Sequence, residues 1–187
     1  MDKIIKFLGN SFTIMCKNAD AGEYWRNIGL GRIAFDMMGR LPEAVPGEFE
    51  TPAEKAGILS MMLDQMDELL SPRLCLRIRQ EIERLNPSAE GNSDGIVLLQ
   101  DYINPDLPME EFCKTYGKHL KFDPVERTEQ YEEVIQEVEA ECDAALSDVP
   151  RSMGYCFAYW AEKRRILAEH GIQWRSPAAM NPGVIFD

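Results

Sequence analysis

Apolar residues recur at helical spacing along most of the chain. Between residues 58 and 70 they fall at every third or fourth position, and acidic or amide residues take the opposite face. Comparable apolar stripes occupy residues 74–85, 131–146 and 153–167. Because this period is that of the α-helix, the pattern predicts an all-α protein.

Helix starts are marked by capping residues followed by proline. Residues 51–54 (Thr-Pro-Ala-Glu) and 123–126 (Asp-Pro-Val-Glu) combine a cap, a proline at the first helical position and a glutamate three residues after the cap. Residues 71–72 and 176–177 (both Ser-Pro) supply a cap and a proline. Gly171 is the expected end of the last long helix. These signals predict where several of the helices begin and end.

Two segments near the N-terminus are less regular. Residues 23–39 are predicted to be helical despite Gly29 and Gly31, which each cost about 1 kcal/mol in a helix interior and indicate a close approach of two helices. Residues 2–16 carry a helical apolar pattern, and the Gly-Asn pair at 9–10 offers a hairpin turn as the alternative. We expect the helix.

The C-terminal segment 172–187 is unusually apolar for a chain end. Terminal residues that fray into solvent are usually small and polar. This segment instead contains Trp174, Val184, Ile185 and Phe186. We therefore expect the tail to be extended and to pack into a groove.

Length and pattern together predict the architecture. At 187 residues the chain suits one helical domain spanning 1–187, with a possible subdivision at the polar linker 86–95. The predicted fold is an irregular orthogonal bundle of six to eight helices, with the extended C-terminal tail packed across it.

The charge is strongly acidic and unevenly distributed. Of a net charge of −12, most comes from residues 126–148, where nine acidic residues accompany Arg127 alone. A nucleic-acid partner is not expected, because such binding depends on lysine and arginine. The acidic segment is interpreted as a solvated helix face, and a docking surface for a basic protein partner is the alternative.

Cysteine usage indicates a reducing compartment. The five cysteines are an odd number and form no CxxC motif, so no disulfide framework is expected and we predict a cytoplasmic protein. No run approaches the ~18 apolar residues of a membrane span, so no membrane association is expected. The two histidines, His119 and His170, lack the spacing to cysteine that structural zinc sites show. We expect no metal and no cofactor.

Cys75 is the strongest candidate for catalysis. It lies in the first turn of a predicted helix, where the helix dipole lowers the pKa of a thiol. Arg73 and Arg77 would hold an anionic substrate, and His119 or His170 would supply a base. The alternative is that Cys75 packs in the core beside its apolar neighbours, and that the arginines pair with the acidic 126–148 helix.

Aromatic and methionine residues suggest binding rather than catalysis. Trp25, Trp160 and Trp174 are candidates to line a small-molecule pocket, although aromatic residues at helical spacing are more often core. Ten methionines include the adjacent pairs 37–38 and 61–62. Neighbours in a helix cannot both face one stripe, so one member of each pair is available to an adaptable interface.

The sequence therefore favours a non-enzymatic binding or protein-interaction module over an enzyme. A protein partner or self-association as a homodimer is expected, and a small-molecule ligand is the further candidate. The alternative is a small hydrolase or transferase with Cys75 as nucleophile and Arg73 and Arg77 binding an anionic substrate.

Overall fold

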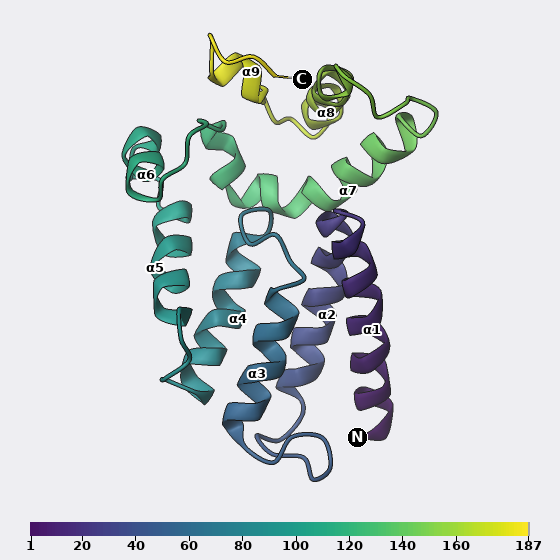
Figure 1. The fold of residues 1–187 in the computed structure, drawn as a ribbon, viewed down its shortest axis with the longest axis vertical. Helices are drawn as coiled ribbons and strands as arrows, with labels where there is room; N and C mark the ends of the chain where they lie inside the picture. The colour runs from purple at the N-terminus through teal and green to yellow at the C-terminus, as the bar shows by residue number, and fades with distance from the viewer. Residues whose placement is uncertain (187) are drawn as a thin grey trace. The chain divides into compact units, whose positions relative to one another are not determined.

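Helices form the regular structure of residues 1–186, the part of the chain that the computed structural model describes (Figure 1). Apart from one isolated bridge between Val45 and Phe49, no β-structure occurs among these residues. This confirms the all-α prediction. The nine α-helices of the described residues are α1 (Asp2–Asp20), α2 (Asn27–Gly39), α3 (Pro52–Leu63), α4 (Pro72–Leu85), α5 (Asn92–Ile103), α6 (Met109–Thr115), α7 (Glu129–Ala145), α8 (Tyr155–Glu169) and α9 (Pro177–Met180).

Three of the four predicted capping side chains form a cap, and two details differ. Ser71 precedes α4 as expected, but its side chain makes no capping hydrogen bond. Thr51 Oγ1 accepts a hydrogen bond from the backbone N–H of Glu54 at 3.2 Å, so α3 starts where the sequence indicated. Asp123 caps only a short 3₁₀ helix, Pro124–Arg127. The chain then turns once more, and Thr128 caps α7 by accepting from the N–H of Tyr131 at 3.3 Å.

The two irregular N-terminal segments are both helical. Residues 2–16 belong to α1, so the expected helix forms rather than the hairpin. A 3₁₀ turn, Tyr24–Arg26, precedes α2. Within α2, a Cβ atom on Gly31 would lie 2.7 Å from Sδ of Met66 and 3.7 Å from Cε of Met15. The close contact at Gly31 is therefore with the side chain of Met66, which follows α3, and the close approach of two helices stays a prediction.

The chain divides into two compact units, Met1–Gln100 and Asp101–Asp187. The boundary lies inside α5 and not in the polar segment 86–95. That segment is anchored within unit 1, because Asn92 Nδ2 donates to the Arg79 carbonyl at 3.0 Å and to Glu83 Oε2 at 2.9 Å. A stretch that reads as a linker in the sequence thus contains the buried start of α5.

The core of unit 1 is formed by its first four helices and the loop between α2 and α3. In this unit α1 packs on α2, and α3 packs on α4. The apolar stripes predicted at 58–70 and 74–85 supply most of the buried side chains. The buried core residues are Met15, Ala34, Met38, Leu41, Val45, Phe49, Ala56, Leu59, Met62, Leu63, Met66, Leu74, Cys75, Ile78, Ile82, Leu85 and Leu99.

The core of unit 2 is built on the pair α7 and α8. Ile135 and Val138 of α7 are fully buried, as are Ile166 and Leu167 of α8. The acidic residues of α7 mostly occupy its exposed face, as the apolar stripe predicted.

The C-terminal tail packs on unit 2 as expected. Ile172 and Trp174 are buried, and Asn181 Nδ2 donates to the Lys121 carbonyl at 2.7 Å while its Oδ1 accepts from the Lys121 N–H at 2.8 Å. One helical turn, α9, interrupts the extended course, capped by Ser176. Docking is incomplete at the end, because Ile185 remains 90% exposed.

Membrane-spanning helices combine length with high hydropathy. None of the helices in residues 1–186 is long and apolar enough to cross a bilayer.

Candidate functional site

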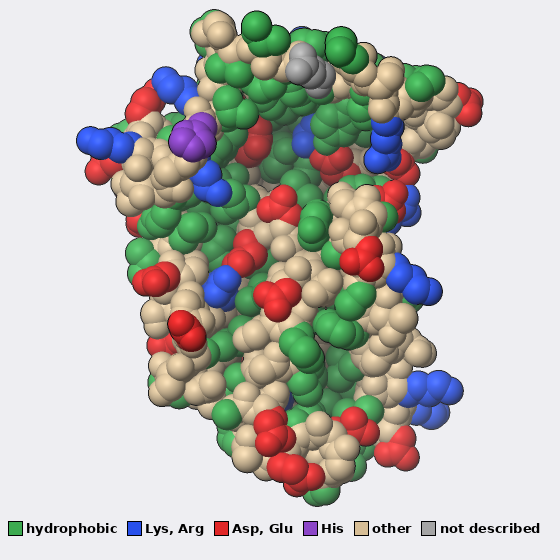
Figure 2. Space-filling model, viewed as in Figure 1, with side chains coloured by type: hydrophobic (Ala, Val, Ile, Leu, Met, Phe, Trp, Pro, Cys, Tyr) green, Lys and Arg blue, Asp and Glu red, His purple; other side chains and the backbone are tan. Residues whose placement is uncertain are grey.

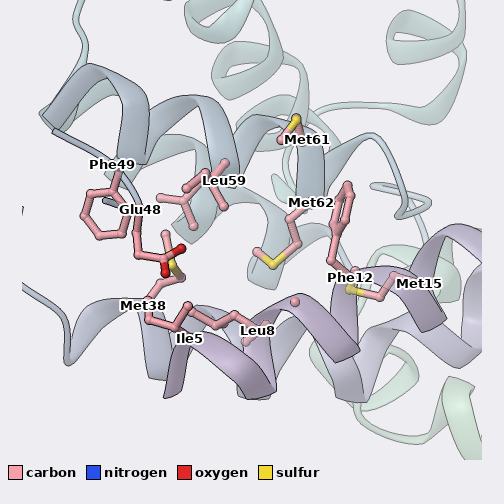
Figure 3. A pocket seen from close by; sticks show the side chains of 13 residues that line it. Ile5, Leu8, Phe12, Met15, Met38, Glu48, Phe49, Leu59, Met61 and Met62 are labelled. Carbon is pink, nitrogen blue, oxygen red and sulfur yellow. The ribbon is translucent and has the colours of Figure 1, made fainter. Parts of the chain in front are cut away.

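Unit 1 contains an apolar pocket of about 230 Å³ that opens to the surface (Figure 3). Helices α1, α2 and α3 and the loop between α2 and α3 contribute its walls. The lining residues are Ile5, Leu8, Gly9, Phe12, Met15, Ala34, Met38, Glu48, Phe49, Ile58, Leu59, Met61 and Met62. We call this cavity the α1–α3 pocket.

The pocket follows from how the three helices carry their apolar residues. Along α1 the lining residues Ile5, Leu8, Phe12 and Met15 fall at i, i+3, i+7 and i+10, which places them on one helical face. Helix α2 contributes the pocket wall with Ala34 and Met38. The apolar face of α1 therefore contributes side chains to both the core and the cavity: Met15 belongs to the core of unit 1 and also lines the cavity.

One residue of the pocket wall has no side chain. Gly9 lines the pocket, and no atom lies within 4 Å of the position that its Cβ would occupy. Its backbone is ordinary helix, so glycine is not required there by conformation. The absence of a side chain at Gly9 leaves space at the surface of α1.

Four methionines line the cavity, and they differ in exposure. Met15, Met38 and Met62 are buried, whereas Met61 is 47% exposed. The adjacent pair 61–62 was predicted to place only one member in the core, and Met61 is the exposed one. Unbranched thioether side chains repack readily, so this lining can adjust to the shape of a bound group.

The only ionisable lining residue is Glu48, on the loop between α2 and α3. This loop is held by the Val45–Phe49 bridge and by Gly47, whose φ of 82° favours glycine and whose N–H donates to Glu50 Oε1 at 2.8 Å. Phe49 is thereby fixed in the core, and the exposed Glu48 places its carboxylate beside the cavity (Figure 3).

The chemistry of the pocket suits binding of an apolar group. Apolar cavities of about 150 Å³ stay dry and accept a molecule the size of benzene, so 230 Å³ accommodates a large aliphatic or aromatic group. The lining contains no histidine, cysteine, serine or lysine. Nothing in the wall resembles a nucleophile with its base.

A second cavity of about 250 Å³ shares Met38 and Leu59 with the first. Lys55 lines it, and its buried Nζ donates to the carbonyls of Leu41 and Pro42 at 2.9 and 3.2 Å. Burial lowers the pKa of Lys55. Through these hydrogen bonds Lys55 fixes the start of the loop that contains Glu48.

None of the sequence candidates for catalysis lines the α1–α3 pocket, and Arg77 alone among them lines the second cavity. Cys75 lies in the first turn of α4 as predicted, but it is 0% exposed in the unit 1 core, with Sγ 3.6 Å from Ser71 Oγ. Arg73 shares that turn, and Arg77 lies over the Phe35 ring at 5.4 Å. The surroundings of Cys75 are those of the core residue that the sequence offered as the alternative.

The two histidines lie in unit 2. His119 is exposed on the connection that follows α6, and His170 follows α8, where its carbonyl accepts from Gln130 Nε2 at 3.3 Å. All five cysteines are thiols. Among residues 1–186 there is no group of three or more His, Cys, Asp or Glu side chains arranged to hold a metal ion.

The three tryptophans occupy separate surroundings and none lines the α1–α3 pocket. Trp25 carries the guanidinium of Arg26 over its ring at 4.4 Å. Trp160 packs edge-on against Phe157 and Phe186, with ring centroids 5.4 and 5.2 Å apart. Trp174 donates from Nε1 to Glu126 Oε1 at 2.7 Å.

Sequence reasoning missed a buried ionic cluster in unit 2. Lys163 of α8 donates to Glu139 Oε1 of α7 at 2.7 Å, and Tyr159 Oη donates to the same carboxylate at 2.6 Å. The rings of Tyr131, Tyr159 and Trp174 surround the ammonium, with centroids 5.5 to 5.7 Å away. Burial opposes the charge, but Tyr159 and Glu139 outweigh it and raise the pKa of Lys163.

This cluster joins α7, α8 and the tail, and its polar groups are paired with one another by hydrogen bonds and cation–π contacts. We therefore interpret it as structural rather than as a binding site. Its sequence signal is weak: Tyr159 and Lys163 stand at i, i+4, and Glu139 adjoins the apolar stripe of α7 next to Val138.

The functional interpretation of the α1–α3 pocket depends on its own lining, volume and charge. The chain was compared with protein-family models, with curated proteins and with solved structures, and no match was found.

Proposed function

We propose that this chain is a non-enzymatic binding protein and that its α1–α3 pocket receives an apolar group of a protein partner. The observation that carries the proposal is the lining: thirteen residues, of which Glu48 alone is ionisable, around an open cavity of about 230 Å³. An open apolar cavity with few polar groups is the usual form of a binding site.

The size of the pocket sets the strength of the interaction. Burying about 100 Å² of apolar surface contributes roughly 2.5 kcal/mol, and association has its own entropic cost. One anchoring side chain in the pocket therefore gives weak binding by itself. A protein partner can add contacts around the rim of the pocket, and these increase the binding free energy. We therefore favour a protein partner over a small molecule.

The enzyme alternative has less support than the binding proposal. Cys75 is enclosed in the core of unit 1 and does not line either cavity described above. A substrate would have to displace core side chains to reach its sulfur. We therefore do not propose a cysteine-dependent hydrolase or transferase.

The pocket is tested with a neutral fluorescent probe, N-phenyl-1-naphthylamine, and the variant Gly9→Leu. The leucine side chain would grow into open space beside the cavity, and leucine favours helix over glycine by about 0.8 kcal/mol. We expect the natural chain to bind the probe with enhanced fluorescence, and Gly9→Leu to bind it at least tenfold more weakly without loss of helical circular dichroism.

The matched control is Gly57→Leu. Gly57 is also helical and exposed, and no atom lies within 4 Å of its Cβ position, but it does not line the α1–α3 pocket. This variant should bind the probe as the natural chain does. If the probe does not bind, or if the two leucine variants bind it equally well, the pocket is not the site.

A further inference from the structure

We infer that the group received by the α1–α3 pocket belongs to a basic amphipathic helix of the partner. This inference rests on the proposed function and adds the chemistry of the partner to it. It draws on the charge of the loop beside the pocket and on the length of the lined face of α1.

The loop that borders the pocket is acidic. Residues 40–55 carry a net charge of −2, because Arg40 and Lys55 at the two ends of the segment flank four glutamates, all of which are exposed. They are Glu43, Glu48, Glu50 and Glu54. Figure 2 shows acidic side chains gathered at the lower end of the view, where the loop between α2 and α3 lies in Figure 1.

This negative charge is partly compensated within the chain, by Arg40 and Lys55 at the ends of the segment and by Arg84. Arg84 pairs with Glu43 at 2.7 Å, but both side chains are more than half exposed, and such pairs contribute little. Glu50 and Glu54 accept hydrogen bonds from the backbone N–H groups of Gly47 and Glu50, which do not cancel their charge.

Glu48 is the closest of these carboxylates to the cavity. Among residues 1–186, no ion pair involves it. Lys55, the nearest basic residue in sequence, directs its ammonium at the carbonyls of Leu41 and Pro42 instead. A lysine or arginine of a partner that inserts an apolar side chain would therefore meet an uncompensated carboxylate at the mouth of the pocket.

The lined face of α1 has the length of a helical binding groove. Ile5 and Phe12 are half-buried and seven residues apart, which corresponds to about 10 Å along the helix axis, whereas Met15 is 0% exposed at the inner end of the face. Apolar residues at i, i+4 and i+7 of a bound helix span about 10 Å and fit within this length. Methionines in the wall tolerate different anchors.

Charge also argues against other occupants. A fatty acid would bring its carboxylate close to Glu48, and like charges at a binding surface reduce affinity. A nucleic acid would be repelled by the same four glutamates. A segment that combines apolar anchors with lysine or arginine matches both the cavity and its rim.

The experiment compares two synthetic 14-residue peptides by fluorescence anisotropy on the full chain. Both carry leucine at i, i+3, i+4 and i+7, and the other positions are lysine in one peptide and glutamate in the other. We expect the lysine peptide to bind at least tenfold more tightly at 0.15 M salt, and its affinity to fall as salt rises. It should also displace N-phenyl-1-naphthylamine from the pocket.

Charge reversal at Glu48 tests whether the lysine peptide binds beside the α1–α3 pocket. Glu48→Lys should weaken binding of the lysine peptide about fivefold, as expected for loss of one attraction near the surface and gain of a repulsion. The control, Glu137→Lys, makes the same charge change at an exposed site on α7 in unit 2 and should leave the affinity nearly unchanged.

The outcomes separate the two proposals. If the neutral probe binds and Gly9→Leu prevents it, but the lysine peptide binds no better than the glutamate peptide, the inference about the partner is overturned and the binding pocket stands. Equal weakening by Glu48→Lys and Glu137→Lys also overturns the inference, because only net charge would then matter. If neither probe nor peptide binds, both proposals fail.

Discussion

Gly95 marks the place where α5 meets the side chain of Arg79. The Arg79 guanidinium makes two hydrogen bonds to the carboxylate of Glu68, both 2.5 Å long, and these raise the pKa of Arg79. A Cβ atom on Gly95 would overlap that guanidinium. The glycine therefore serves a close approach inside unit 1.

We predict that Gly95→Ala lowers the free energy of unfolding by about 1–3 kcal/mol, because the guanidinium must leave its place and the alanine gains only about 1 kcal/mol in helix propensity. Gly57→Ala, which meets open space on α3, should instead raise it by roughly 0.5–1 kcal/mol. Urea unfolding followed by circular dichroism measures both. Equal stabilisation by the two alanines would contradict the role given to Arg79.

Three glycines show how far the role of a single residue can be predicted from the sequence. Gly31 was expected to mark a close approach of two helices, and it instead provides space for the side chain of Met66, which lies just after α3. Gly95 was assigned to a linker, because the sequence places it among polar residues and does not show that Arg79 packs over it. Gly9 was considered only as a turn, since its role beside a cavity depends on neighbours that are distant in sequence.

At the scale of elements, the buried cluster holds α7, α8 and the tail of unit 2 together. The Lys163 ammonium is neutralised by Glu139, and Trp174 of the tail covers it while donating to Glu126. Burial raises the pKa of Glu126. The tail is thus fixed by polar groups as well as by the apolar surface that the sequence indicated.

We predict that Glu139→Gln lowers the free energy of unfolding by about 3–5 kcal/mol, because it removes the only carboxylate among residues 1–186 that is ion-paired with the buried ammonium of Lys163, and Glu126 interacts with that ammonium less strongly. Tyr159→Phe removes one hydrogen bond to the carboxylate and should cost less, about 2 kcal/mol. Glu137→Gln on the exposed face of α7 should change little. Guanidinium unfolding of the three variants tests this order. A Glu139→Gln variant as stable as Glu137→Gln would show that the pair is not structurally important.

Local elements were more predictable than their packing. Helix starts at Thr51 and Ser176 were read correctly, because a cap is made by residues within four positions of one another. The start of α7 moved from Asp123 to Thr128, because Arg127 turns inward and donates to the backbone carbonyls of Asp101, Tyr102, Asn104 and Leu107 at the end of α5. Such long-range hydrogen bonds leave no periodic signal.

On the scale of the whole chain, the all-α fold followed from the 3.6-residue period, which is a local property. The candidate site did not follow in the same way. Methionine content and one exposed member of the pair 61–62 suggested an adaptable surface, but the cavity exists only because the apolar face of α1 is left partly uncovered by α2 and α3. The acidic segment of unit 2 drew attention in the sequence, whereas the four glutamates beside the pocket did not.

The most direct test of the account is a methyl nuclear magnetic resonance titration of the full chain, labelled with ¹³C at the methionine methyl groups, with the lysine peptide. Ten methionines give separate probes, and four of them, Met15, Met38, Met61 and Met62, line the α1–α3 pocket. We predict that the signals of these four shift together as the peptide binds, while those of Met109 and Met153 in unit 2 do not. Shifts confined to Met153, which is 87% exposed at the start of α8, would place binding on that apolar surface and contradict the assignment of the pocket.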